Sequence, residues 1–450
     1  MELLEEAIAG LNPEQKEAVV HDHAAGGQLL VLAGAGSGKT RVLTLRIARL
    51  VETGVAPERI VCVTFTVAAA AEMRERLALW LGKERAGRIR ACTFHSLAWT
   101  FLRESPPGSS LPPGWKLLGF PARPRIAEAE EPDPDSPASA SAGRPAAKPP
   151  RAHGAPRGEE VALDELMPLA SELLATSPEA LAAWRRSCEH LLIDEFQDID
   201  PGQYAFCRTL AGDSPNLCAV GDDDQAIYGF RGADPGCILG FLRDFPGGRL
   251  VKLETNYRSH PHVLELANRI FADKEERFRK TLRPPASREG ERGDPPRAIR
   301  LDSGNGWDQM RLVAALVRTR AAQGVPVGKM AILCRVNRLC ATMRKGMDRF
   351  GVPQELVVQT VHASKGLEYD TVFLVGLEEG LFPLEDADLQ EERRLFYVAV
   401  TRARERLYLL RTKERVWKGK RKAFRPSRFL RWHVEPLGTR LLRGLGLSDG

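Results

Sequence analysis

The 450-residue sequence has no long apolar run, no closely paired cysteines and no strong excess of one charge. No stretch approaches the roughly 18 apolar residues that cross a membrane, and no apolar core follows a basic start. The eight cysteines show no C-x-x-C spacing and lie mostly in apolar runs, which indicates buried thiols in a reducing compartment rather than a metal site. These absences predict a cytoplasmic protein that does not bind membranes.

The composition alone does not identify the binding partner of the protein. The formal net charge of +6 and the pI near 8.9 suit a polyanionic partner, but an ordinary protein can have the same values. The length is sufficient for two domains of ordinary size with separate cores.

An apolar stretch at residues 29–33 runs directly into the sequence Ala-Gly-Ala-Gly-Ser-Gly-Lys-Thr. Small residues let backbone N–H groups approach phosphates, a lysine reaches the β and γ oxygens, and a threonine hydroxyl binds Mg²⁺. Helical spacing after this loop would place the phosphates at a helix N-terminus. Ala33 stands where the usual pattern has glycine, which is harmless if its torsion is one that alanine adopts. The predicted nucleotide-binding residues here are Ala33, Gly34, Ala35, Gly36, Ser37, Gly38, Lys39, Thr40 and Arg41.

A second short apolar stretch, at residues 190–193, ends at Asp194 and Glu195. We expect Asp194, with Thr40, to hold Mg²⁺ and Glu195 to orient or deprotonate an attacking water. Hydrolysis needs such a pair, whereas transfer to a small substrate does not. The pair therefore favours an ATPase over a kinase, with Lys39, Asp194 and Glu195 as catalytic residues.

With these two segments, the remaining blocks resemble the UvrD/Rep/PcrA-type DNA helicases of superfamily 1, in the order of that family. The resembling blocks are residues 11–15, 33–40, 64–66, 93–97, 194–198, 220–233, 253–259, 361–369 and 391–403.

Alternating apolar and helical segments predict an α/β fold with parallel sheets. The resemblance implies two RecA-like P-loop motor domains with the ATP site in the cleft between them. The expected strands are 29–33, 60–64, 89–93, 190–193, 217–220 and 250–253 in the first domain, and 298–301, 330–335, 354–360, 371–375 and 407–410 in the second, with helices at 307–323, 337–350 and 389–404.

The predicted domain borders depart from the family pattern. Residues 1–104 begin the first motor domain, and a Pro/Ala-rich disordered or extended linker at 105–160 replaces an accessory subdomain. The first domain continues over 161–255 with a short helical insert at 163–183. The second motor domain covers 256–430 without the large inserted subdomain, and 431–450 form a tail. The leucines expected to pack the insert on the motor are Leu166, Leu169, Leu173 and Leu174.

By resemblance, Gln15 and Tyr257 hold the adenine and Glu368 accepts from the ribose. Gln225 reports the γ-phosphate, and Arg258 and Arg402 act as arginine fingers that neutralise transition-state charge. The nucleotide-binding set also includes Gly366.

The DNA contacts follow from the same blocks. Aromatic rings stack on bases without reading sequence, although core packing is the alternative for each ring. The expected stacking residues are Phe65, Tyr228 and Phe230, and the expected backbone contacts are His95, Arg231, Arg335, Asn337 and His362.

Val67 and Ala68 stand where relatives typically have Asn-Lys, which predicts a weaker grip on DNA or a changed path. Basic residues after 410 either compensate as a phosphate patch or form a merely solvated loop. These residues are Arg411, Lys413, Lys418, Lys420, Arg421 and Lys422.

The resulting hypothesis is an ATP- and Mg²⁺-dependent DNA translocase or helicase that moves 3′ to 5′ on single-stranded or tailed duplex DNA, in repair or replication. A protein partner for unwinding or nuclease activity is expected. Two alternatives stay open: an NTP-gated DNA-binding or recruitment module, and a motor subunit of a nuclease–helicase assembly that does not unwind by itself.

Overall fold

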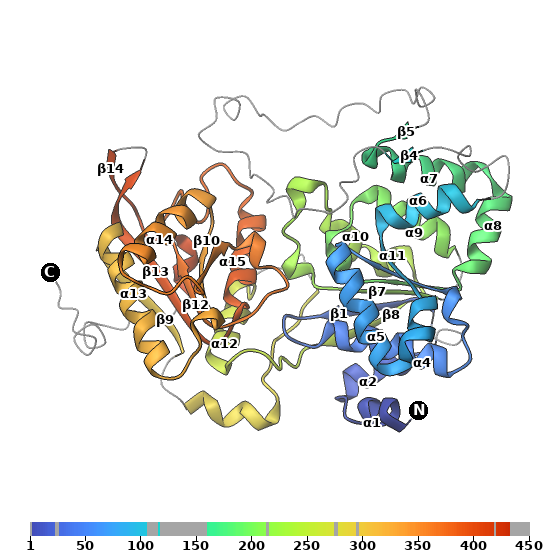
Figure 1. The fold of residues 1–450 in the computed structure, drawn as a ribbon, viewed down its shortest axis with the longest axis horizontal. Helices are drawn as coiled ribbons and strands as arrows, with labels where there is room; N and C mark the ends of the chain where they lie inside the picture. Colours follow the sequence, from blue (N-terminus) through green and yellow to red (C-terminus); the bar gives the residue numbers. More distant parts are fainter. Residues whose placement is uncertain are drawn as a thin grey trace. The chain divides into compact units, whose positions relative to one another are not determined.

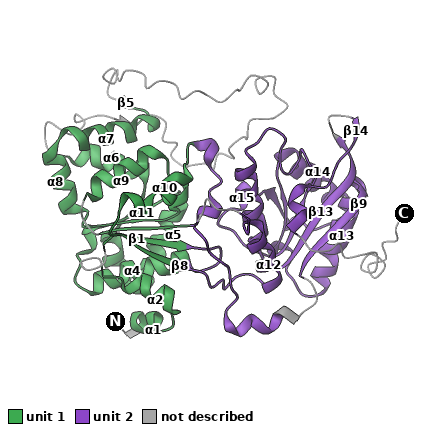
Figure 2. Cartoon of the chain, turned by 180° about the vertical axis from the view of Figure 1, so that it is seen from behind, with its two compact units in different colours: residues 1–32, 39–221, 232–251 green, residues 33–38, 222–231, 252–450 purple. Residues whose placement is uncertain are grey.

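The structure is a computed structural model that describes residues 2–22, 27–105, 116–117, 160–212, 216–273, 278–293, 297–417 and 420–432 (Figure 1). Contacts divide the chain into unit 1, residues 1–32, 39–221 and 232–251, and unit 2, residues 33–38, 222–231 and 252–450 (Figure 2). The domain borders expected from the sequence stay a prediction.

Unit 1 is built on a six-stranded sheet with the order β3-β2-β6-β7-β1-β8. The pairs β1–β7, β2–β3, β2–β6 and β6–β7 are parallel, as expected. Strands β1, β2, β6 and β7 are buried along their whole length, which is typical of a parallel sheet covered on both faces. The strand bounds are β1 Leu29–Ala33, β2 Ile60–Thr64, β3 Arg90–Thr93, β6 His190–Ile193, β7 Leu217–Gly221 and β8 Arg249–Leu253.

Several helices of unit 1 begin at a residue whose side chain caps the first turn. Thr66, Thr93 and Asp200 each accept a hydrogen bond from a backbone N–H in the first turn of the following helix. The helices are α1 Glu2–Ala9, α2 Pro13–Val20, α4 Lys39–Glu52, α5 Val67–Arg88, α6 Phe94–Glu104, α7 Leu166–Thr176, α8 Pro178–Ser187, α9 Pro201–Ala211, α10 Pro235–Leu239 and α11 Phe241–Asp244.

The helical insert is two helices rather than one. Pro178 cannot continue α7, and the Ser177 side chain accepts from the Ala180 N–H to start α8. Leu166 and Leu174 are buried, whereas Leu169 and Leu173 are only half-buried. Of the predicted linker, the structure describes only Ser105, the two-residue strand β4 Lys116–Leu117 and Glu160 of β5 Glu160–Val161; the rest lies outside the described residues.

Unit 2 contains a second sheet with the order β11-β10-β12-β13-β14, and β9 also pairs with β13. All its pairs are parallel except β13–β14. The two sheets confirm the expected α/β class. The elements are α12 Pro261–Ile270, β9 Ala298–Asn305, α13 Gly306–Ala322, β10 Met330–Cys334, α14 Asn337–Arg349, β11 Val357–Thr360, β12 Tyr369–Val375, α15 Leu389–Val400, β13 Ala403–Trp417 and β14 Lys420–Ala423.

The expectation of a short last strand followed by a basic loop is wrong. β13 continues to Trp417 and turns into β14, because β9 and β14 supply backbone partners on its two edges. Arg411 is buried beside Asp302, 2.9 Å away, so it does not belong to an exposed basic surface. Lys413, Lys420, Arg421 and Lys422 are exposed, and Lys418 lies outside the described residues.

Two predictions concerned membrane-spanning segments and the state of the cysteines. None of the helices in the described ranges is both long and apolar enough to cross a bilayer. All eight cysteines are free thiols, and only Cys92 is not buried.

Candidate nucleotide and DNA sites

The loop after β1 has the backbone shape that phosphate binding requires. Gly36 and Gly38 have φ values of 65° and 86°, which favour glycine. Ala33 is the last residue of β1 and has no positive φ, so alanine meets no torsional penalty there. The departure from the usual glycine is therefore sterically harmless.

Asn256 holds this loop in place. Its Nδ2 donates to the Ala35 carbonyl at 2.6 Å, and the neighbouring Tyr257 N–H donates to the Gly36 carbonyl at 2.9 Å. A Cβ on Gly36 would lie 2.6 Å from Asn256 Nδ2. The sequence analysis missed Asn256, because nothing local in the sequence shows that this amide reaches a loop more than two hundred residues earlier.

Lys39 begins α4, and its ammonium group is buried without a hydrogen-bond partner among the described residues. The nearest carboxylate oxygen, Oε1 of Glu195, is 3.6 Å from Nζ. A buried ammonium group without hydrogen bonds is costly unless a ligand satisfies it. This position suits the anionic oxygens of a nucleotide.

Asp194 and Glu195 lie at the carboxyl end of β6. Burial, and then the charge of Glu195, raise the pKa of Asp194 to about 7, and Lys39 only partly opposes this. Glu195 has φ 50°, the one positive φ of a non-glycine residue in the described ranges, and its carboxylate accepts from Gln197 Nε2. Strained torsions of this kind cluster at functional sites.

Asp194 and Thr40 have the side-chain oxygens that a divalent cation requires. Carboxylate and hydroxyl oxygens are the ligands that Mg²⁺ prefers, and Asp194 and Thr40 provide them. A bound cation would also relieve the crowding of negative charge that raises the Asp194 pKa.

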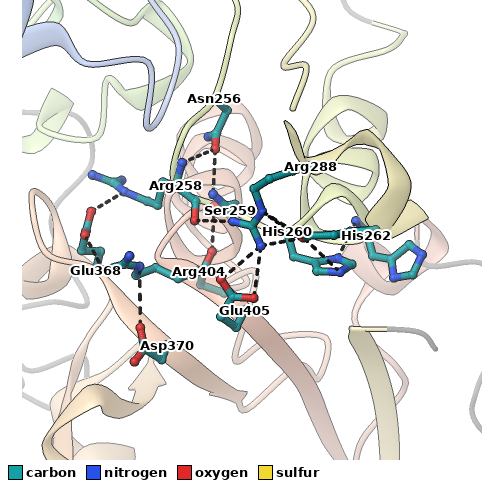
Figure 3. Close-up of polar contacts among 12 residues, drawn as sticks. Asn256, Arg258, Ser259, His260, His262, Arg288, Glu368, Asp370, Arg404 and Glu405 are labelled. Atoms are coloured by element: carbon teal, nitrogen blue, oxygen red, sulfur yellow. Dashed lines mark hydrogen bonds and ion pairs between the residues drawn. The ribbon is translucent and has the colours of Figure 1, made fainter. Parts of the chain in front are cut away.

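In unit 2, Arg258, one of the two predicted arginine fingers, forms an ion pair with Glu368, the predicted ribose acceptor. Arg258 Nε lies 2.6 Å from Glu368 Oε2, and Arg404 Nη1 donates to the other Glu368 oxygen at 3.3 Å (Figure 3). Arg404 Nε also lies 3.6 Å from Asp370. The carboxylate of Glu368 is thus shared between two guanidinium groups.

The other predicted nucleotide residues occupy varied environments. Arg402 is buried and donates to the carbonyls of Val398 at 3.0 Å and Leu367 at 2.9 Å. Gln15 forms a capping box with Asn12 at the start of α2. Tyr257 is 46% exposed, which leaves part of its ring open for stacking. Gly366 has a positive φ, and Arg41 is exposed.

Gln225 is held from two sides within unit 2. Its side-chain Nε2 donates to Asp222 Oδ2 at 2.6 Å, and its backbone carbonyl accepts from Lys365 Nζ at 3.0 Å. The three consecutive aspartates before it surround the buried ammonium group of Lys280 at 2.7, 2.5 and 2.7 Å. Burial opposes the charged form, but the three carboxylates together raise the pKa of Lys280 well above its usual value. The sequence analysis missed Lys280, because its counterions are distant in sequence.

An aromatic cluster follows Gln225. Phe230 is 53% exposed, and its ring meets Tyr228 edge-on at 6.0 Å and His362 at 5.6 Å. The guanidinium group of Arg231 lies over both Phe230 and Tyr228, and Lys365 Nζ lies 4.9 Å from the Tyr228 ring centre. The structure therefore brings four of the predicted DNA residues together.

Two further DNA candidates lie near the end of β10. Arg335 is buried, and its Nε donates to Glu392 Oε1 at 2.8 Å. This engagement does not support the expected contact with a DNA backbone. Asn337 is exposed at the first position of α14.

In unit 1, Phe65 and His95 follow the paired ends of β2 and β3, where Thr64 is in register with Thr93. Both side chains are half-buried, and burial lowers the pKa of His95 although Asp200 opposes the shift. Val67, 47% exposed, begins α5 beside the exposed Ala68.

Comparison with known proteins decides the family. Residues 11–121 and 151–246 match the UvrD/REP helicase N-terminal domain, and 251–359 and 354–414 match the UvrD-like helicase C-terminal domain. A probable DNA helicase of Mycoplasma pneumoniae is 31% identical over 94% of this chain and 86% of its own length. The chain belongs to the UvrD-type helicase family.

Other members of the UvrD-type family are longer. DNA helicase II of Escherichia coli is 34% identical over 78% of this chain but only 51% of its own length. The ATP-dependent DNA helicase PcrA of Leuconostoc citreum is 32% identical over 77% of the chain and 50% of its own length. The chain thus spans about half the length of these relatives.

The predicted nucleotide residues and the predicted stacking and backbone contacts lie within the segments that match the UvrD-type domains. Residues 418–422 of the possible phosphate patch, β14 and the end of β13 lie beyond residue 414. The relatives are named as helicases, which does not favour the recruitment module or the nuclease-associated subunit.

Proposed function

We propose that this chain is an ATP-dependent DNA translocase with helicase activity, moving 3′ to 5′ on single-stranded DNA. The observation that carries the proposal is the buried ammonium group of Lys39, which has no hydrogen-bond partner in the described residues and lies beside the acidic pair at the end of β6. A family-typical P-loop with an unsatisfied cation is prepared for a nucleoside triphosphate.

Each residue of this proposal has a role in hydrolysis. Lys39 binds the phosphate oxygens, and Thr40 with Asp194 holds Mg²⁺, which supplies charge neutralisation when bound. Glu195 orients the attacking water and accepts its proton. Gln225 contacts the γ-phosphate, and Arg258 and Arg402 neutralise charge that develops on it.

The nucleotide contacts beyond the phosphates follow the family pattern. Gln15 hydrogen-bonds the adenine, Tyr257 stacks on it, and Glu368 accepts from the ribose hydroxyl. Because Glu368 is paired with Arg258 and Arg404, ribose binding must compete with an existing ion pair. Release of Arg258 from Glu368 would free its guanidinium group for phosphate.

On the DNA side, the exposed Phe230 and the neighbouring Tyr228 stack on bases, while Arg231 and His362 contact the backbone. Lys365 Nζ donates to the backbone carbonyl of Gln225 and also lies over the Tyr228 ring. A movement of Gln225, the proposed γ-phosphate sensor, would therefore be transmitted through Lys365 to the stacking residues. In unit 1, Phe65 and His95 are the proposed contacts to DNA.

The proposed cellular location is the cytoplasm. The free thiols suit the reducing cytoplasm. A DNA motor of this family there serves repair or replication, with a protein partner for tasks that two motor domains do not perform.

The decisive experiment measures steady-state ATP hydrolysis with and without single-stranded DNA, followed by unwinding of duplexes with a 3′ or a 5′ tail. Stimulation together with unwinding of the 3′-tailed duplex alone would support the proposal in full. Streptavidin displacement from each DNA end measures translocation separately from unwinding. Absence of DNA stimulation would contradict the motor, and preference for the 5′ tail would contradict the direction.

A further inference from the structure

Unit 2 carries a hollow of about 490 Å³ that contains none of the predicted nucleotide residues and, of the predicted DNA residues, only Arg421 of the basic segment after residue 410. It lies among α13, α14 and the β13–β14 hairpin, which are labelled in Figure 1. Its apolar lining consists of Trp307, Met310, Leu339, Met343 and Val416. Exposed apolar surface that gathers around a hollow marks an interaction site more often than single exposed residues do.

The two most accessible side chains of this lining are large. Trp307 is 44% exposed and Val416 is 70% exposed, although burial of either side chain is favourable. Trp307 is fixed rather than free, because its ring packs 4.9 Å from Phe350 and the Arg349 guanidinium lies 4.8 Å from its centre. A pre-arranged aromatic wall loses little entropy when a partner binds.

The helices α13 and α14 pack closely beside the hollow. A Cβ at Gly346 would lie 2.2 Å from Met310 Sδ, so α13 and α14 approach closely at this glycine. Arg415 is neutralised by Glu378 at 2.7 Å and also bonds Gln309 at 2.6 Å. Its charge therefore does not attract a ligand into the hollow.

The rim of the hollow is basic. Arg338 and Arg421 line it, whereas Lys420 and Lys422, the neighbours of Arg421 on β14, do not, because successive side chains of a strand point to opposite faces. Glu414 is the single acidic residue of the lining. Complementarity to such a rim selects an acidic partner.

The hairpin also offers a free backbone edge. β14 is the last strand of its sheet, and no other strand pairs with its outer edge in the part of the chain that the structure describes. All four of its residues are exposed, and an extended peptide can add to such an edge as a further strand. Its three basic residues repel a second copy of the same strand, which disfavours self-association.

We infer that the hollow and the β14 edge form a docking site for an extended acidic segment of a partner protein. One large apolar side chain of that segment fills the hollow, and acidic neighbours meet Arg338 and Arg421. Part of this surface lies beyond residue 414, where the match to the family domains ends. The inference does not depend on ATP hydrolysis and is testable without it.

The probe is a fluorescein-labelled nine-residue peptide with a central tryptophan and flanking aspartate and glutamate, titrated with the full chain and read by fluorescence anisotropy. We expect micromolar affinity that weakens with salt, since charge steers the complex. Two control peptides replace the tryptophan by serine or the acidic flanks by lysine, and both should bind at least about tenfold more weakly.

Two variants locate the site. Val416→Asp and Arg421→Glu should each weaken the acidic peptide by about tenfold or more without changing the melting temperature, and Val416→Asp should also leave DNA-stimulated ATP hydrolysis unchanged. Leu79→Asp is the matched control, because Leu79 is 77% exposed on α5 of unit 1. This control should bind the peptide like the unmodified chain.

Three results would overturn the inference. The first is equal binding of all three peptides or none, and the second is undiminished binding to both variants. The third is loss of affinity for single-stranded DNA in Val416→Asp and Arg421→Glu without peptide binding, which would make the hairpin a nucleic-acid contact.

Discussion

Two lysines with buried ammonium groups have very different surroundings in this chain. Lys39 in unit 1 has one carboxylate 3.6 Å away and no hydrogen-bond partner among the described residues. Lys280 in unit 2 has three carboxylates within 2.7 Å. The first group has one ion pair and no hydrogen bond among the described residues, whereas the second is surrounded by its counterions.

This difference separates a binding group from a structural one. A buried charge without partners lowers stability, so it persists where function requires it. A buried charge with several partners is costly to disrupt, because removing one group leaves the others unpaired. The same contrast distinguishes the exposed Phe230 from Arg335, which is already engaged with Glu392.

The largest effect is expected from Lys39→Ala. If this lysine serves a ligand and not the fold, ATP hydrolysis should fall by roughly a thousandfold or more, because the phosphates lose their main cation. DNA binding should persist, and urea unfolding should change by less than about 1 kcal/mol. Retained hydrolysis would show that the nucleotide site is assigned wrongly.

Lys280→Met should have the opposite profile. Three buried aspartates would lose their counterion, so the free energy of unfolding should fall by about 3–5 kcal/mol in urea titrations. Adding Asp223→Asn to this variant should restore part of the loss by removing one uncompensated charge. A variant as stable as the unmodified chain would contradict the structural role of Lys280.

Phe230→Ala probes a group that is exposed rather than engaged. Loss of a stacking ring should weaken single-stranded DNA binding by about 1–3 kcal/mol and should reduce DNA-stimulated hydrolysis more than basal hydrolysis. Trp307→Ala is the matched control, since Trp307 is a similarly exposed aromatic residue of unit 2. Equal loss of basal and stimulated rates would indicate that Phe230 is structural.

The smallest effect is a gain. Ala68→Lys adds a cation at the exposed start of α5, where relatives carry lysine by resemblance. Affinity for single-stranded DNA should rise a few-fold, and its salt dependence should steepen by about one phosphate contact. Leu79→Lys, on an exposed position of the same helix, should leave the salt slope unchanged.

Much of the fold was predictable because short buried apolar runs identify parallel strands. β1, β2 and β6 begin and end where the apolar runs do. The break between α7 and α8 was also readable, since Ser177-Pro178 is a helix-start signal that the apolar periodicity obscured. The β13–β14 pair was not, because its charged residues become strands only when β9 and β14 supply backbone partners to β13.

The residues of the candidate site also differ in whether their role could be predicted from the sequence. Lys39, Asp194 and Glu195 were predictable, because each follows a strand end in a motif with a chemical reason. Asn256, Lys280 and Lys365 were not, because their partners lie far away in the sequence.

The sequence by itself determined which chemical groups stand at the strand ends, since strand–loop–helix order and residue type are local properties of the chain. Only the tertiary structure decided which of those groups are already paired. Pairing depends on long-range distance and on burial. Lys39 has a single ion pair and no hydrogen bond among the described residues, Arg258 lies against Glu368, and three carboxylates surround Lys280.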